Sequence, residues 1–213
     1  MDFLPKEINE YCSLYTQKED DVLYQLYRET HQKILRPRML SGHIQGQLLT
    51  FFSKMVEPEY ILEIGTYTGY SAICLARGLK AGGKLHTIDI NEELEDFACS
   101  FIEKAGLKDS VEMHIGEAIK IIPSLQKKWS LVFIDADKEN YINYYNLVFN
   151  SIKNGGFIIF DNVLWSGKVT EEVDSKDKET RTLVELAKLL QEDNRVENVL
   201  LPVRDGLFMV RKK

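Results

Sequence analysis

The 213-residue sequence has few of the features that mark disulfide-bonded, secreted or membrane proteins. Its three cysteines, Cys12, Cys74 and Cys99, are odd in number, widely spaced and form no CxxC pair. This argues against a disulfide framework or a zinc site and favours a reducing, cytoplasmic location. No apolar run approaches the ~20 residues of a membrane helix, and the first residues lack the basic and apolar parts of a signal peptide. We therefore expect no association with membranes.

An excess of positive charge is also missing. The formal net charge is −6, which gives no general electrostatic attraction to nucleic acid or to anionic membranes. A local basic patch would still suffice for binding RNA. The candidates for such a patch, if they share a face, are Lys33, Arg36, Arg38, Lys127 and Lys128.

What the chain does contain is a regular alternation of strand and helix patterns from Tyr60 onward. Apolar strands are expected at about 60–64, 85–90, 111–115, 130–135 and 156–160. Helical stretches are expected between them, at about 70–79, 92–105, 118–126 and 140–152, and again at 178–192 after a polar loop (166–177). This alternation predicts a parallel sheet that is covered on both faces.

The two ends of the chain depart from that alternation. Residues 1–57 read as a helical N-terminal cap on the core of residues 58–213. Two final strands, at about 197–203 and 207–211, flank an Asp-Gly hairpin turn. The fold class is therefore α/β, a Rossmann-like doubly wound seven-stranded sheet with its last strand antiparallel, in a single domain of residues 1–213.

A glycine-containing turn follows the first expected strand. Gly65 and Gly69 permit a tight turn and close approach to a ligand, but their GxxxG spacing differs from the dinucleotide fingerprint. Glu63, at the strand end, needs a partner, because burying an unpaired carboxylate costs several kcal/mol. Loop amides or a ligand's ammonium group would satisfy it. Asp89 ends the next strand at the usual distance for binding ribose hydroxyls, although it could instead cap the next helix.

Two further strands end in oxygen ligands. Asp135 follows the apolar run at 131–134, and Asp161 and Asn162 follow the run at 157–160. Ligands in open α/β sheets bind outside the carboxyl ends of the strands, so neighbouring strands would bring these three oxygens together as a site for a hard divalent cation. Asp137 is instead expected to cap the helix that begins near residue 140.

The histidines suggest no additional metal site. His86 lies in an apolar strand and is expected to be a core residue, and His31, His43 and His114 have no partner at metal-ligand spacing. Trp165, just after Asn162, either forms a wall of an acceptor pocket or serves packing alone.

Three motifs in this order resemble the metal-dependent S-adenosylmethionine O-methyltransferases of the catechol and caffeoyl-CoA type, which include bacterial members. The motifs are EIGTYTGYS (63–71), FIDADK (133–138) and DNVLW (161–165), and the resemblance runs from about Met39 to the C-terminus. It implies S-adenosyl-L-methionine near Met39, Glu63, Gly65, Tyr67, Ser71, Asp89, Ala118 and Asp135. It implies Mg²⁺, or Ca²⁺ or Mn²⁺, on Asp135, Asp161 and Asn162, with Lys138 and Asp135 catalytic, and it implies a homodimer.

The expected reaction is methyl transfer to a hydroxyl of a catechol-like, hydroxylated aromatic small molecule. The resemblance leaves the acceptor open, because plant members carry an acidic pair where Ile44 and Gln45 stand here. Transfer RNA carrying 5-hydroxyuridine is the alternative acceptor. An NAD-dependent oxidoreductase is the distant alternative, disfavoured by the GxxxG spacing and by the absence of a Tyr-xxx-Lys motif.

Overall fold

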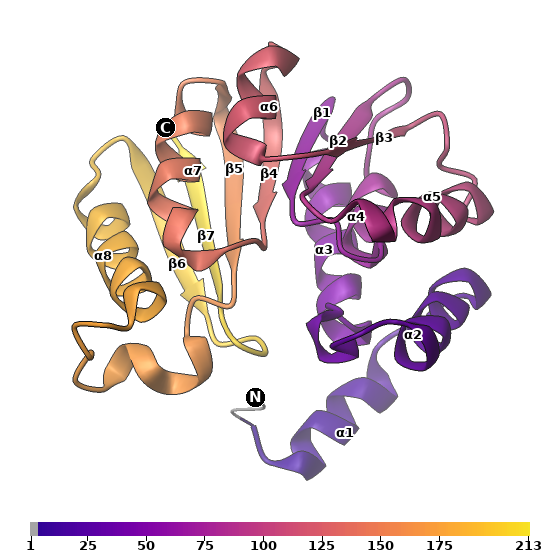
Figure 1. Ribbon diagram of the computed structural model, residues 1–213, viewed down its shortest axis with the longest axis horizontal. Coiled ribbons are helices and arrows are strands. Elements are labelled where there is room, and N and C mark those ends of the chain that lie inside the picture. Colours follow the sequence, from indigo (N-terminus) through magenta and orange to yellow (C-terminus); the bar gives the residue numbers. More distant parts are fainter. Residues whose placement is uncertain (1–3) are drawn as a thin grey trace.

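The computed structural model describes residues 4–213, which form a seven-stranded sheet with helices on both faces (Figure 1). The strands are β1 (Tyr60–Ile64), β2 (Lys84–Asp89), β3 (Val111–Ile115), β4 (Trp129–Ile134), β5 (Ile152–Asp161), β6 (Val196–Leu201) and β7 (Leu207–Lys212). Their order across the sheet is β3-β2-β1-β4-β5-β7-β6. Strands β1 to β5 pair in parallel, whereas β7 runs antiparallel to both β5 and β6. The predicted fold class and the final hairpin are confirmed.

Eight α-helices lie within the described residues. They are α1 (Lys6–Tyr15), α2 (Asp21–Lys33), α3 (His43–Val56), α4 (Tyr70–Ala76), α5 (Glu95–Lys104), α6 (Ala118–Leu125), α7 (Tyr141–Phe149) and α8 (Lys178–Glu192). Four short 3₁₀ helices accompany them: η1 (Pro37–Met39), η2 (Glu92–Leu94), η3 (Lys138–Asn140) and η4 (Trp165–Thr170). Helix η4 occupies part of the expected polar loop. Among residues 4–213, no helix combines the length and apolarity needed to cross a membrane.

The start of β5 differs from the sequence prediction. The sequence predicts this strand at about 156–160. In the structure both glycines lie inside β5, which begins at Ile152. Gly155 has φ +78°, and the pairing of β4 with β5 shifts register between Trp129 and Leu131. The strand therefore begins earlier than predicted, with an irregularity near its glycines.

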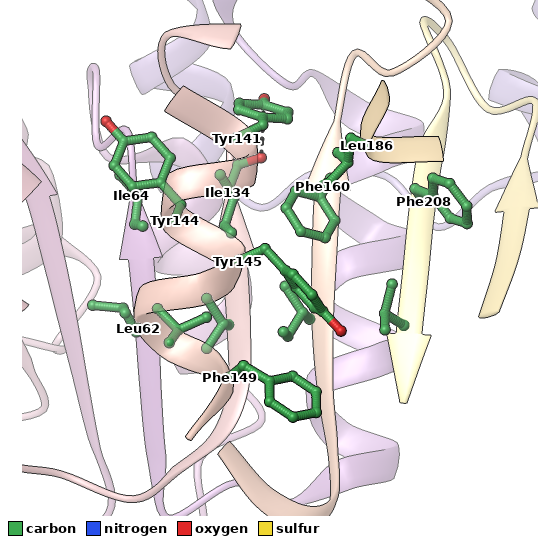
Figure 2. Packing of buried hydrophobic residues seen from close by; sticks show 14 of the residues in the cluster. Leu62, Ile64, Ile134, Tyr141, Tyr144, Tyr145, Phe149, Phe160, Leu186 and Phe208 are labelled. Atoms are coloured by element: carbon green, nitrogen blue, oxygen red, sulfur yellow. Dashed lines mark hydrogen bonds between the residues drawn. The ribbon is translucent and has the colours of Figure 1, made fainter. Parts of the chain in front are cut away.

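Strand side chains alternate between two hydrophobic layers, because successive residues of a strand point to opposite faces. Leu62 and Ile64 of β1 face helices α6, α7 and α8, whereas Ile61 faces α3, α4 and α5. Figure 2 shows the first layer, where Tyr145 of α7 lies beside Phe160 of β5. Burial on both faces explains why these strands are continuous apolar runs.

The parallel register aligns the ends of four strands. Ile64 of β1 pairs with Ile88 of β2 and with Ile134 of β4, and Ile134 pairs with Phe160 of β5. The residue after each pair therefore lies on the same edge of the sheet. That edge carries Gly65, Asp89, Asp135 and Asp161. Helices α1 and α2 lie beyond one end of the sheet and not over a face (Figure 1).

Gly65 is required at this edge for both space and conformation. Its φ is +101°, and a Cβ atom would lie 1.8 Å from the backbone carbonyl oxygen of Asp135. The atoms that this Cβ would meet all belong to the backbone of Asp135 and Ala136, so no flexible side chain could move aside to make room. The loop after β1 therefore passes directly over the end of β4.

We predict that Gly65→Ala lowers the free energy of unfolding by at least roughly 3 kcal/mol, since left-handed strain and overpacking add. Gly82→Ala is the matched control. Gly82 also has a positive φ, +77°, but a Cβ there meets nothing within 4 Å, so strain alone should cost about 1–2 kcal/mol. Urea unfolding measures both, and equal losses would contradict the steric role of Gly65.

Candidate functional site

The loop after β1 is tied to the end of β2 by Asp89. The Tyr67 backbone N–H donates to Asp89 Oδ2 at 2.7 Å, and the Asn91 N–H donates to Asp89 Oδ1 at 2.9 Å. Helix η2 is capped by the Asn91 side chain, which accepts from the Glu93 N–H. Asp89 therefore shapes the glycine loop, and within the segment 89–91 the helix cap is supplied by Asn91 and not by Asp89.

Glu63 is a fully buried carboxylate beneath this loop. Thr87 Oγ1 donates to Glu63 Oε2 at 2.6 Å, whereas Oε1 has no hydrogen-bond partner among the described residues. Burial raises the pKa of Glu63 to about 8; the hydroxyls of Ser71 and Thr87 lower it in part, and Asp135 adds to the rise. A buried acceptor without a donor is rare in proteins. Its presence beneath a glycine loop fits a ligand that brings an N–H or ammonium donor.

The remaining residues expected at the cofactor occupy the same edge in different ways. The Tyr67 hydroxyl lies within hydrogen-bond distance of the carbonyl oxygens of Leu35 and Arg36, 3.2 and 3.4 Å away. Ser71 is buried in α4 and Ala118 is buried as the first residue of α6, whereas the Met39 side chain in η1 is half exposed. Contact of any of the eight expected residues with a cofactor stays a prediction.

Lys138 is the centre of the second half of the site. This side chain is only 4 % exposed. Its Nζ donates to Asp135 Oδ1 at 3.2 Å and to Asn162 Oδ1 at 3.1 Å. The ammonium group thus bridges two of the three oxygen ligands predicted for a cation. The sequence prediction that these residues of β4 and β5 lie together is confirmed by their contacts with one cationic group.

Asp161, the third predicted ligand, is buried beside this ammonium. Its Oδ2 accepts from Gln45 Nε2 at 2.5 Å, and its Oδ1 accepts from the Asn162 N–H at 2.7 Å. Burial raises the pKa of Asp161 to about 7, and the nearby Asp135 carboxylate adds to the rise; Lys138 opposes it. The site thus gathers two carboxyl groups and one amide oxygen around one ammonium group. This oxygen-rich set fits a divalent cation such as Mg²⁺.

Three residues of the site were not among the sequence candidates. Tyr141 accepts from Lys138 Nζ at 2.5 Å and is fully buried, which raises its pKa. Gln45 holds Asp161, and Arg204 Nη1 donates to the carbonyl oxygens of Leu40 and Ser41. Tyr141 stands three residues after Lys138, a spacing that could have indicated contact. Nothing in local spacing points to Gln45 or Arg204, because each acts across more than 100 residues.

Two smaller expectations had different outcomes. Asp137 precedes η3, but its side chain makes no capping bond to the backbone. It accepts instead from the Tyr144 hydroxyl at 2.6 Å and from the side chain of Asn140, so the predicted cap is wrong. Trp165 lies beside the site, with its ring 5.8 Å from Lys138 Nζ.

Comparison with known proteins agrees with this geometry. A family model described as O-methyltransferase matches residues 12–213. Caffeoyl-CoA O-methyltransferase 5 of Nicotiana tabacum is 36% identical over 185 residues, covering 82% of this chain and 77% of that protein. The O-methyltransferase of Bacillus cereus, solved in complex with SAH, has a TM-score of 0.90 at 30% identity, covering 97% of both chains. The O-methyltransferase TomG of Streptomyces achromogenes, solved with SAM, has a TM-score of 0.88 at 28% identity, covering 97% of this chain and 96% of that one.

The chain belongs to this O-methyltransferase family. It is an S-adenosylmethionine-dependent O-methyltransferase of the caffeoyl-CoA type. The nicotinamide oxidoreductase alternative is set aside.

We predict that Glu63 makes the cofactor-free protein less stable as the pH rises. The unfolded chain releases the Glu63 proton above pH about 4.5, whereas the folded chain keeps it until about 8. Between these values ionisation favours unfolding, by about 5 kcal/mol in total. Glu63→Gln removes this group but keeps an acceptor for Thr87. The unfolding free energy of the wild type should therefore fall relative to the variant between pH 5 and pH 8, and parallel pH profiles would contradict the buried carboxyl's role.

Proposed function

We propose that this enzyme methylates a hydroxyl of a vicinal-diol aromatic small molecule and depends on a divalent cation for doing so. The observation that carries the proposal is the Lys138 ammonium group held between Asp135 Oδ1 and Asn162 Oδ1, with the Asp161 carboxylate beside it. These oxygens come from adjoining strand ends and already hold one cationic group. The caffeoyl-CoA names of the relatives support an aromatic acceptor.

Two bound groups would supply the chemistry. When bound, S-adenosylmethionine supplies the methyl group from its sulfonium, and a divalent cation on Asp135, Asp161 and Asn162 supplies positive charge beside the acceptor oxygen. That charge matters because a phenol with a pKa of about 10 is rarely ionised at neutral pH, a cost of ~4 kcal/mol. Mg²⁺ is the ion we propose, with Ca²⁺ or Mn²⁺ as substitutes, because all three protein ligands are oxygens.

The chain's own residues position the acceptor and remove its proton. With a divalent cation on the strand-end oxygens, Lys138 would first release one proton to solvent, and its neutral amine would then take the hydroxyl proton as the new C–O bond forms and the C–S bond breaks. Tyr141, Asp135 and Asn162 fix the place of Nζ through their hydrogen bonds. Gln45 fixes the orientation of the Asp161 carboxylate. Alignment of this kind can contribute roughly 7–11 kcal/mol to a displacement reaction in favourable cases.

Glu63 and Asp89 hold the donor in this proposal. Glu63 Oε1 is the buried acceptor that a ligand N–H would satisfy, and Asp89 lies where a ribose would present its hydroxyls. Gly65, Tyr67 and Ser71 shape the loop between them. Trp165 is proposed as a wall of the acceptor pocket, supported by its place beside Lys138.

A transfer RNA acceptor has weaker support. Lys127 and Lys128 directly precede β4, whereas Asp135 follows the opposite end of that strand. The five basic candidates therefore do not gather at the site, and RNA contact would depend on residues 33–38 alone. This alternative is tested as one arm of the experiment below.

The proposal is tested by labelled-methyl transfer from S-adenosylmethionine to a catechol, a catechol-bearing coenzyme A thioester and total tRNA. We expect transfer to a vicinal diol, its loss with a chelator and its return with Mg²⁺. A monophenol of the same skeleton is the control acceptor and should react poorly, because it offers only one oxygen to the cation. Full activity in the chelator would refute metal dependence. Transfer to tRNA alone, falling steeply with salt, would assign the RNA acceptor instead.

Lys138→Ala should lower kcat by roughly 100- to 10,000-fold, the usual contribution of a positioned acid–base group. The dissociation constant of S-adenosylmethionine should change little, because Lys138 contacts the strand ends and not the glycine loop. Lys108→Ala is the matched control, since this lysine is exposed and pairs only with Glu103. Near-normal turnover in Lys138→Ala would remove this residue from the mechanism.

We further propose that the enzyme is a homodimer. Helix α1 has no buried side chain and exposes Ile8, Tyr11 and Leu14. A second copy would cover this apolar side, and the solution mass from sedimentation decides the question.

We also propose that residues 1–213 act as one domain with 1–57 as its cap, supported by the Gln45–Asp161 bond. Its three free cysteines are compatible with the expected cytoplasmic location.

A further inference from the structure

Away from the active edge, strands β2 and β3 bring together three side chains that bind metals in other proteins. His86 of β2 pairs directly with Glu112 of β3, and His114 lies two residues further along β3 on the same face. The sequence expectation that His114 has no partner at metal-ligand spacing is therefore wrong. The contact is made by strand pairing between residues 28 apart, which local spacing does not reveal.

The donor atoms, one from each residue, lie within 4.8 Å of one another. His86 Nδ1 lies 3.1 Å from His114 Nε2, and the two oxygens of Glu112 face different rings: Oε2 lies 3.6 Å from His86 Nδ1, and Oε1 lies 3.7 Å from His114 Nε2. A tetrahedral ion with bonds of about 2.0–2.1 Å requires donor atoms about 3.4 Å apart. The three side chains thus approach the required spacing with only small adjustments.

The surroundings keep the His86 imidazole in place and uncharged. It is 4 % exposed, packs edge-on against Trp129 at 5.7 Å and stacks on His114 at 5.4 Å. Burial lowers the pKa of His86, with Glu112 acting in the opposite direction. Neutral imidazole is the form that binds metals. The Glu112 side chain is 59 % exposed, so this group of three side chains opens to solvent.

We propose that His86, Glu112 and His114 form a second cation site, for a borderline transition-metal ion such as Zn²⁺. Two imidazoles with one carboxylate suit Zn²⁺, whereas Mg²⁺ prefers oxygen ligands throughout. Three protein ligands leave a fourth position for water. This site therefore differs in ligand chemistry from the strand-end oxygens at Asp135 and Asp161.

The ion would act on the edge strand of the sheet. β3 pairs only with β2, and none of its five side chains is fully buried. An ion bound by residues of both strands would stabilise the pairing of β3 with β2. The strand leads through Gly116 into Ala118 at the start of α6. Zn²⁺ bound here would thus hold the turn at the end of β3 in place.

The test uses untagged, metal-stripped protein titrated with Co²⁺, which gives intense visible absorption only in tetrahedral or similar sites. We expect such bands in the wild type, their displacement by Zn²⁺ and no displacement by excess Mg²⁺. His114→Ala should weaken binding by at least about tenfold, and Glu112→Gln should also weaken it. His31→Ala is the matched control because His31 is an exposed histidine outside the cluster, and it should bind as the wild type does.

A second readout follows the consequence for β3. Amide hydrogen exchange in residues 111–115 should slow on addition of Zn²⁺ in the wild type and not in His114→Ala. Asp161→Asn should keep the Co²⁺ bands, which separates this site from the strand-end oxygens. Three results would overturn the proposal. They are the absence of Co²⁺ bands in the wild type, equal Co²⁺ affinity in the wild type and His114→Ala, and loss of the bands in Asp161→Asn alone. Should His114→Ala fail to fold, Glu112→Gln decides the same question. None of these readouts needs methyltransferase activity.

Discussion

The active edge depends on the hydrogen bonds of one buried ammonium group. Lys138 is held by Asp135, Asn162 and Tyr141, so its charge is balanced where water cannot reach it. Burial raises the pKa of Asp161 to about 7, and the Asp135 carboxylate adds to the rise. The edge therefore gathers two carboxyl groups and one amide oxygen around a single ammonium group. A site of this kind favours any additional cation that can reach its oxygens.

The register of the sheet turns distant residues into neighbours. Because β1, β2, β4 and β5 stop together, residues that are far apart in sequence meet along a single line. In the proposed function, the methyl donor binds near Glu63 and Asp89, and the acceptor binds near Asp135 and Asp161. Gly65 joins the two sides, since only a residue without Cβ fits above the Asp135 carbonyl. The packing of the glycine loop therefore also determines where the groups on the two sides of Gly65 lie relative to each other.

Sequence reasoning succeeded where polar ligand residues directly follow an apolar run of strand length. The strand ends marked by Asp135, Asp161 and Asn162 were predictable, because all three residues follow apolar runs in a chain that also carries the glycine loop. Contacts between residues far apart in the sequence were not predictable. Gln45 reaches Asp161 from the N-terminal segment, and His86 meets His114 through strand pairing. Asp137 was misread as a cap because the sequence does not reveal that Tyr144 and Asn140 claim its carboxylate.

The contact between Arg204 and the carbonyl oxygens of Leu40 and Ser41 has a consequence for synthesis of the chain. The guanidinium group comes from the turn before the last strand, whereas its acceptors precede the whole sheet. A growing polypeptide on the ribosome therefore lacks this contact until Arg204 has been added, after strands β1 to β6. The segment that delivers Gln45 to the reaction centre stays unanchored from that side until then, so a nascent chain cannot assemble the finished centre early.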